Sequence, residues 1–175
     1  MRNEKRGTKK WTAMLAALLI IHVTCLTYSC TSVDCPVENK VYTVYNLLKA
    51  NGSTDTLKVD TLSIITKRAN DTDTILLNRL TGISTFDLPI SYTLPEDIFY
   101  LTLLDTIGHT YQDTIFIKKE NYPHFESVDC QATYFHRLTE VRTTKHIIDS
   151  IVINNPTVNY DAKNEHFHIY FKARY

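Results

Sequence analysis

The chain has 175 residues, of which 43% are hydrophobic and 22% charged, a composition typical of a folded globular protein and unlike that of a disordered or collagen-like chain. Its 19 Lys and Arg residues balance its 19 Asp and Glu residues, so the chain lacks the basic excess expected of a nucleic-acid-binding protein. At this length one domain is expected.

The N-terminal segment has the pattern of an export signal. Residues 1–10 are strongly basic, and an apolar run over residues 11–26 follows them. This run is shorter than the roughly 20 residues that a membrane-spanning helix needs. A basic start and a short apolar run are typical of a secretory signal peptide, and an uncleaved membrane anchor is the alternative interpretation.

The end of this segment, Ser29-Cys30, resembles the lipobox of bacterial lipoproteins, in which a small residue precedes the lipidated cysteine. We therefore expect residues 1–29 to be a lipoprotein signal peptide, Cys30 to carry the lipid, and residues 30–34 to form a short tether to a domain at residues 35–175. Removal of residues 1–29 leaves 14 basic and 18 acidic residues, a net charge of about −4. The expected location is the bacterial cell envelope, on the periplasmic or surface face of a membrane.

Two cysteines remain once Cys25 leaves with the signal and Cys30 carries lipid, namely Cys35 and Cys130. Exported proteins tolerate disulfides, so a bridge between these two is expected. It would close a loop of about 95 residues, which is worth roughly 4–5 kcal/mol in the chain-entropy model. Two buried free thiols are the alternative.

The rest of the chain has the pattern of short strands separated by turns. A strand over residues 41–48 is followed by a turn at Asn51-Gly52. The parity of the apolar residues changes between Leu57 and Leu62, so a bulge or break is expected near residues 60–61. Gly108-His109 marks the turn of a hairpin. Further strand-like segments are residues 74–80, 83–88, 99–104, 111–118, 125–141 and 147–153.

The closing segment has the clearest alternation in the chain, with Phe167, Ile169 and Phe171 separated by polar or amphipathic residues. It predicts an amphipathic strand. About nine strands with no convincing helical period predict an all-β fold, an antiparallel β-sandwich of the immunoglobulin-like kind. A closed barrel is the alternative, because strand spacing alone does not separate the two.

A tripeptide of Asp, then Thr or Ser, then an aliphatic residue recurs along the mature chain without a fixed spacing. Ordinary strand starts explain it, because Asp favours turns and Thr and Ile favour strands. The tripeptides also resemble the O-glycosylation signal of Bacteroidota, in which Asp precedes the modified hydroxyl residue. The candidate sites on that interpretation are Thr56, Thr61, Thr74, Thr106, Thr114 and Ser150. Thr106, beside Gly108, is expected to be the most accessible.

Two histidines, His166 and His168, are two residues apart in the expected closing strand, so both rings would reach one metal ion from the same face. The sequence fixes no further ligands, and exposed strand histidines are the simpler interpretation. No cofactor is expected. The chain also lacks the G-x-S-x-G motif of nucleophilic hydrolases, so no catalytic residue is assigned.

Several motifs together carry a resemblance: Cys35-Pro36, residues 77–80, residues 86–92, the segment from Pro123 to Cys130, and residues 148–156. With these the chain resembles a family of small Bacteroidota lipoproteins classed as a domain of unknown function, over roughly residues 34–175. The resemblance implies an envelope location and a pair of cysteines at Cys35 and Cys130. It implies no activity, ligand or catalytic residue.

The function expected from these patterns is that of a membrane-anchored envelope lipoprotein, a non-catalytic binding or assembly module. Its expected partners are the membrane, through lipid on Cys30, and an envelope protein or glycan, but not nucleic acid. Two alternatives come from other classes: a metal-binding lipoprotein that uses His166 and His168, and an envelope hydrolase.

Overall fold

The computed structural model describes residue 11, residue 35 and residues 40–67, 72–161 and 163–173. The chain divides into two compact units, Met1–Cys35 and Pro36–Tyr175. Within the described residues no helix has the length and hydropathy to cross a membrane. The expected signal peptide, Cys30 and most of the tether lie outside the described residues.

The second unit is built of β-strands, and the described residues from 40 onward contain no helix. This confirms the expected all-β class. The strands are β1 (Tyr42–Leu48), β2 (Thr61–Lys67), β3 (Asp73–Leu80), β4 (Thr85–Pro89), β5 (Glu96–Leu104), β6 (Thr110–His124), β7 (Thr133–Thr143), β8 (Ile148–Ile153), β9 (Thr157–Val158) and β10 (Phe167–Phe171).

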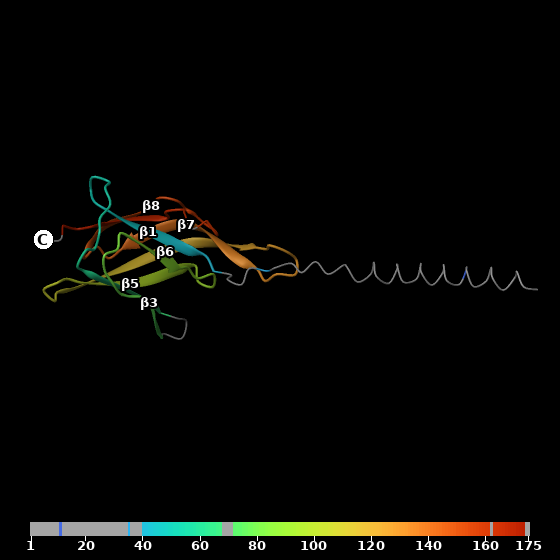
Figure 1. The fold of residues 1–175 in the computed structure, drawn as a ribbon, viewed down its shortest axis with the longest axis horizontal. Coiled ribbons are helices and arrows are strands. Elements are labelled where there is room, and N and C mark those ends of the chain that lie inside the picture. Colours follow the sequence, from blue (N-terminus) through green and yellow to red (C-terminus); the bar gives the residue numbers. More distant parts are fainter. Residues whose placement is uncertain (1–10, 12–34, 36–39, 68–71, 162, 174–175) are drawn as a thin grey trace, which may run out of the picture. The chain divides into compact units, whose positions relative to one another are not determined.

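The strands form two open sheets, which confirms the sandwich rather than the barrel (Figure 1). One sheet has the order β4-β1-β10-β8 and the other the order β3-β2-β5-β6-β7-β9. The pairing is antiparallel except between β1 and β10, which run parallel, with Tyr45 opposite Phe167. The first and last strands of the domain thus lie side by side in the smaller sheet.

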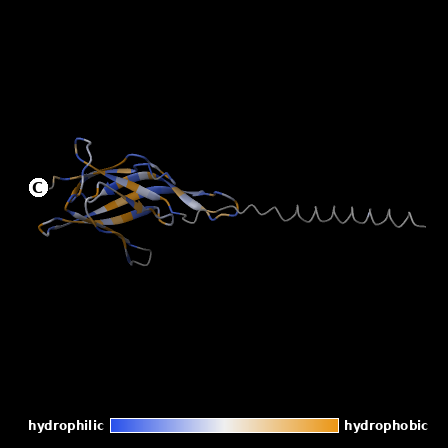
Figure 2. Cartoon of the chain, viewed as in Figure 1, coloured by the Kyte–Doolittle hydropathy of each residue, from blue (hydrophilic) through white to orange (hydrophobic). Residues whose placement is uncertain are grey.

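Apolar and polar residues alternate along the strands, as the colours in Figure 2 show, and this alternation places one face of most strands in the core. In β5 the inward residues Phe99, Leu101 and Leu103 are buried. In β10 Phe167 and Ile169 are buried, as the closing alternation predicts. Burial of this apolar face between the two sheets supplies the main driving force for folding.

Tyr45 of β1 is fully buried at the centre of the smaller sheet. Its ring stacks on Phe86 of β4 and Phe167 of β10, each with ring centroids 4.8 Å apart. The phenol oxygen accepts a hydrogen bond of 3.2 Å from the Thr43 hydroxyl. Burial strongly raises the pKa of Tyr45, so the phenol stays neutral.

The expected break near residues 60–61 is present. Leu57 forms an isolated bridge with Ile83, and β2 begins at Thr61. Leu57 and Val59 are two residues apart and would point to the same face of a strand, but Leu57 is buried and Val59 is exposed. No continuous strand passes through these residues, so alternation does not apply to them.

The expected strand over residues 125–141 is wrong in its first half. Residues 125–132 form the connection between β6 and β7, and β7 begins only at Thr133. Pro123 is part of β6. It lies beyond the last pairing of β6 with β5, where β6 has a partner on one side only, and such edge positions tolerate proline.

Candidate functional site

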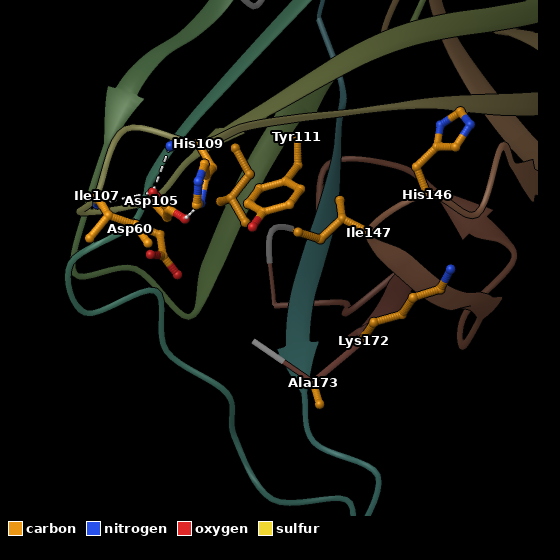
Figure 3. A pocket seen from close by; sticks show the side chains of 10 residues that line it. Asp60, Asp105, Ile107, His109, Tyr111, His146, Ile147, Lys172 and Ala173 are labelled. Carbon is orange, nitrogen blue, oxygen red and sulfur yellow. Dashed lines mark hydrogen bonds and ion pairs between the residues drawn. The ribbon is translucent and has the colours of Figure 1, made fainter. Parts of the chain in front are cut away.

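A hollow of about 440 Å³ opens where four segments of the chain converge at one end of the domain (Figure 3). Asp60 comes from the approach to β2, and residues 103–111 contribute lining from the end of β5, the β5–β6 turn and the start of β6. His146 and Ile147 come from the β7–β8 connection, and Lys172 and Ala173 follow β10. The lining therefore combines carboxylates, imidazoles, an ammonium group and apolar side chains.

The β5–β6 turn is shaped by Asp105. Its Oδ1 accepts hydrogen bonds from the main-chain N–H groups of Ile107 at 3.0 Å and His109 at 2.8 Å. Gly108 has a φ of 93°, a left-handed conformation that glycine adopts at little steric cost. This side-chain cap is a frequent role of Asp in turns, and it fixes the wall of the hollow.

Asp105 also holds the imidazole of His109. Its Oδ2 lies 3.1 Å from His109 Nδ1. Desolvation alone would raise the pKa of Asp105, but hydrogen bonds from His109 and Ile107 outweigh it and keep this pKa below its usual value. A carboxylate that orients an imidazole is one half of a nucleophilic constellation. Among the described residues that line the hollow, none is a serine, threonine or cysteine.

The rim of the hollow is apolar and exposed. Ile107 is 76% exposed and Tyr111 is 40% exposed. The rings of His109 and Tyr111 meet edge to face, with centroids 6.4 Å apart. In Figure 3, Asp60, Asp105 and His109 lie on one side of the hollow and His146 and Lys172 on the other, with Tyr111 and Ile147 between them. This combination of polar walls and an apolar rim suits binding.

The C-terminal wall is fixed by two hydrogen bonds of Lys172. Its main-chain N–H donates to the carbonyl oxygen of Ile147 at 2.9 Å, and its Nζ donates to the carbonyl oxygen of Lys145 at 2.6 Å. A second hollow of about 780 Å³ shares Asp60, Lys172 and Ala173 with the first. The surface at this end is thus concave over a wider area than one hollow.

A second group of polar residues lies inside the sandwich. Lys119 of β6 and Asp97 of β5 form an ion pair of 2.5 Å, and Lys119 Nζ also donates to the carbonyl oxygen of Leu94 at 2.9 Å. His136 of β7 is buried beside them, with its Nδ1 2.7 Å from the Oδ1 of Asn121. We call Asp97, Lys119, Asn121 and His136 the buried polar cluster.

Burial controls the charges of the cluster. Desolvation raises the pKa of Asp97, although the hydrogen bond and charge of Lys119 act against this rise. Burial and the nearby charge of Lys119 lower the pKa of His136 to about 4, so the imidazole is neutral at pH 7. None of these side chains lines the hollow beside the β5–β6 turn. Asp97, Lys119 and His136 are buried, whereas Asn121 is half-buried.

The two histidines considered as metal ligands do not share a site. His166 is fully buried ahead of β10, and its Nδ1 accepts the main-chain N–H of Val44 at 3.0 Å while its Nε2 bonds the carbonyl oxygen of Thr157 at 3.1 Å. Both nitrogens are therefore occupied by the main chain. His168 bonds Glu165 instead. Among the described residues no group of three or more His, Cys, Asp or Glu side chains is arranged to hold a metal ion.

The candidate glycosylation hydroxyls differ in accessibility. Thr106, in the β5–β6 turn, is exposed. The others are half-buried, namely Thr56, Thr61, Thr74, Thr114 and Ser150. The Asp residues of two tripeptides have structural roles: Asp105 caps the turn described above, and Asp113 is buried under the β7–β8 connection. These roles account for part of the recurrence without modification.

The expected disulfide is confirmed, because Cys35 and Cys130 are both disulfide-bonded. Cys130 lies in the β6–β7 connection. The hollow lies at the other end of β6, whose 15 residues span roughly 45 Å at about 3.3 Å per residue. Figure 1 shows the β5–β6 turn and the β6–β7 connection at opposite ends of the domain.

The sequence interpretation missed the buried polar cluster and the hollow. A signal for the cluster was present, because Lys119 shares strand parity with Ile115 and Ile117, and Asp97 shares it with Phe99. The alternation therefore placed both charges on the inner face. The hollow has no comparable signal, since its walls come from segments far apart in the sequence.

Comparison with protein families matches residues 61–171 to the Family of unknown function (DUF6452). The match spans β2 to β10 and is narrower than the expected resemblance, which began near residue 34. It includes most of the lining of the hollow, the buried polar cluster and Cys130. No curated protein and no solved structure matches the chain. The chain belongs to the DUF6452 family, whose function is unknown.

Proposed function

We propose that the protein is a lipid-anchored protein of the bacterial cell envelope that works as a non-catalytic binding module, with the hollow beside the β5–β6 turn as its binding surface. The observation that carries this proposal is the hollow of about 440 Å³, with Ile107 and Tyr111 exposed at its rim. Large apolar side chains exposed beside a concave surface mark interaction sites.

The anchoring part of the proposal rests on the N-terminal sequence. A basic start, a short apolar run and the Ser29-Cys30 junction favour export and lipidation at Cys30. The Cys35–Cys130 disulfide agrees with an oxidising compartment. The hollow lies at the end of β6 away from Cys130, so an anchored domain presents it away from its tether.

The chemistry of the lining favours a ligand with both apolar and polar groups. Tyr111 offers an aromatic face, and Asp105 and His109 offer a polar wall beside it. Such a surface suits a glycan or a segment of an envelope protein. The bonded side chains of Asp105 and Lys172 keep the walls in place, which lowers the entropy cost of binding.

Site-specific photo-crosslinking in the native host tests the binding role. A crosslinking amino acid replaces Ile107 at the rim, and the matched control replaces Val152, which is exposed on β8 away from the hollow. We expect a discrete crosslinked product from position 107 and none from position 152. The same products from both positions, or no product from position 107, would contradict the assignment of the hollow.

Labelling with a fatty acid tests the anchor. The wild-type protein should incorporate the label, and Cys30→Ala should abolish it. The matched control is Cys25→Ala, which should keep the label because Cys25 leaves with the signal peptide. Label that persists in Cys30→Ala would place the modification elsewhere.

A further inference from the structure

β6 and β7 extend beyond β5 in the larger sheet, and over this length the two-residue strand β9 is the only other described strand that pairs with β7. The last residue of β6 that pairs with β5 is Lys118, opposite Glu96, whereas β6 continues to His124 and pairs with β7 as far as Thr133. We call residues 119–138 the β6–β7 arm, and residues 125–132, which contain Cys130, its tip. Figure 1 shows the arm (yellow to orange) reaching past the other strands of the domain.

Aromatic rings cover the arm near its tip. Tyr134 stacks on Tyr92 with centroids 4.7 Å apart, and Phe135 stacks on His124 at 4.3 Å. Tyr160 meets Phe135 edge to face at 5.0 Å. Tyr134 and Phe135 are neighbours in a strand, so their side chains point to opposite faces. The rings therefore surround the arm on both of its faces and are held in place by one another.

The tip exposes large apolar side chains. Phe125 is 61% exposed and Val128 is 97% exposed. Tyr122 in β6, and Tyr92 and Tyr160, whose rings contact the arm, are exposed as well. Rings with an apolar body and a polar hydroxyl are enriched at the boundary between lipid and water. We call Tyr92, Tyr122 and Tyr160 the tyrosine collar. An apolar tip flanked by such tyrosines is the arrangement expected at the boundary between lipid and water.

The length of the tether expected from the sequence points to the occupant of this surface. Cys130 lies in the tip and is bonded to Cys35. The five residues from Cys30 to Cys35 reach at most about 17 Å. The acyl chains on Cys30 therefore enter the bilayer within that distance of the disulfide, and the arm tip is the part of the domain that this short tether holds at the membrane.

The charges near the tip point to an apolar contact rather than an electrostatic one. Residues 121–136 contain no Lys or Arg. Glu126 pairs with His124 at 3.1 Å, and Asp129 adds a second carboxylate beside the disulfide. A surface that binds anionic lipid headgroups needs a cluster of basic side chains, which this tip does not have.

We propose that the tip of the β6–β7 arm docks onto the bilayer that holds the lipid of Cys30, with Phe125 and Val128 in its interfacial region and the tyrosine collar at the headgroups. This inference rests on the proposed lipidation and extends it. Two contacts, the acyl chains and the tip, then fix the orientation of the domain. The hollow stands roughly 45 Å from the tip along β6, at about 3.3 Å per residue, and faces away from the membrane.

Tryptophan quenching tests the docking in the full lipidated protein. The chain has 1 Trp, at position 11, within the segment expected to leave with the signal, so an introduced tryptophan reports alone. Phe125→Trp places the probe at the tip, and Ile107→Trp places the matched control at the rim of the hollow. The proteins are reconstituted in phosphatidylcholine vesicles whose acyl chains carry bromine, which quenches tryptophan on contact.

We expect quenching at position 125 to exceed that at position 107 several-fold, in neutral vesicles and in vesicles with added phosphatidylglycerol alike. Adding Val128→Asp to Phe125→Trp should reduce the quenching at least two-fold, whereas adding Val152→Asp on β8 should leave it unchanged.

Equal quenching at positions 125 and 107, in protein whose intact mass includes the lipid, would contradict the docking of the tip. It would not contradict the lipidation of Cys30. Quenching at position 125 that requires phosphatidylglycerol would overturn the docking too. An intact mass without lipid would overturn the proposed anchor itself, and the docking with it.

Discussion

The carboxylate of Asp113 accepts the main-chain N–H of Ile148 at 2.8 Å, and this bond joins the two sheets of the sandwich. Asp113 belongs to β6 of the larger sheet, and Ile148 is the first residue of β8 in the smaller one. The same carboxylate accepts the N–H of Ile147 at 2.8 Å and the N–H of His146 at 3.2 Å. The hydroxyl of Thr144 donates to it as well.

Replacing Asp113 by Asn should destabilise the fold by at least about 2 kcal/mol, because an amide turns an NH₂ group toward donors that need an acceptor. The matched control is Asp149→Asn, in a tripeptide of the same kind but with an exposed side chain, and its effect should stay within about 0.5 kcal/mol. Denaturant unfolding measures both. Equal stability of the two variants would show that the carboxylate does not hold the connection between the sheets.

The lowered pKa of Asp113 predicts how the stability of the fold changes with pH. Burial raises this pKa, but the hydrogen bonds from Ile148, Thr144, Ile147 and His146 outweigh burial and hold it below its usual value. The stabilisation is therefore fully present above the pKa of an unfolded aspartate, about 3.9, and is lost as the pH falls through the folded value. Asp113→Asn should lose this acid-side dependence.

The ion pair of the buried polar cluster predicts a second stability effect. Lys119→Met leaves the carboxyl of Asp97 in the core without its partner, and breaking a buried ion pair in this way typically costs about 3–5 kcal/mol. The double variant Asp97→Leu/Lys119→Met removes both charges and should recover most of that loss. Urea unfolding of wild type, the single variant and the double variant decides this. A double variant less stable than Lys119→Met alone would contradict the argument.

His136 predicts a loss of stability on acidification. Its folded pKa of about 4 lies below the usual 6.5, so the unfolded chain binds a proton between these values and the folded protein does not. Stability therefore falls as the pH drops from about 6.5 to 4, by up to about 3 kcal/mol from this residue. His136→Gln should flatten the curve over that range. Parallel curves for wild type and His136→Gln would contradict the assignment.

The fold was predictable from the sequence where alternation is local. Phe167, Ile169 and the inward residues of β5 follow their parity, so the strands and the sandwich class could be derived. Asp97 and Lys119 lie just outside the strands expected at residues 99–104 and 111–118, and parity does not reveal that the two charges meet. Local patterns likewise miss the parallel pairing of β1 with β10 and the hollow, because both depend on segments distant in the sequence.

The metal hypothesis shows a different limit of such reasoning. Spacing alone suggested that His166 and His168 project from one face, but His166 precedes β10 and is buried. Its ring bonds Val44 and Thr157, residues that the sequence pattern does not connect to it. The partners of a polar side chain, and not its spacing, decide whether its lone pairs are free for a metal.

Thr106 is the candidate hydroxyl that O-glycosylation is predicted to use. It is exposed in the β5–β6 turn, whereas the other candidates are half-buried within or beside strands, and a transferase acting on a folded protein needs an accessible hydroxyl. Protein from the native host should carry a sugar increment in its intact mass that Thr106→Val removes. Thr61→Val, at a half-buried position, is the matched control and should keep the increment.

The glycan would stand beside Ile107 at the rim of the hollow, so Thr106→Val should also change crosslinking from position 107. A mass equal to that of the lipidated polypeptide would leave the tripeptides as turn and strand-start residues, with Asp105 and Asp113 in the structural roles described for them.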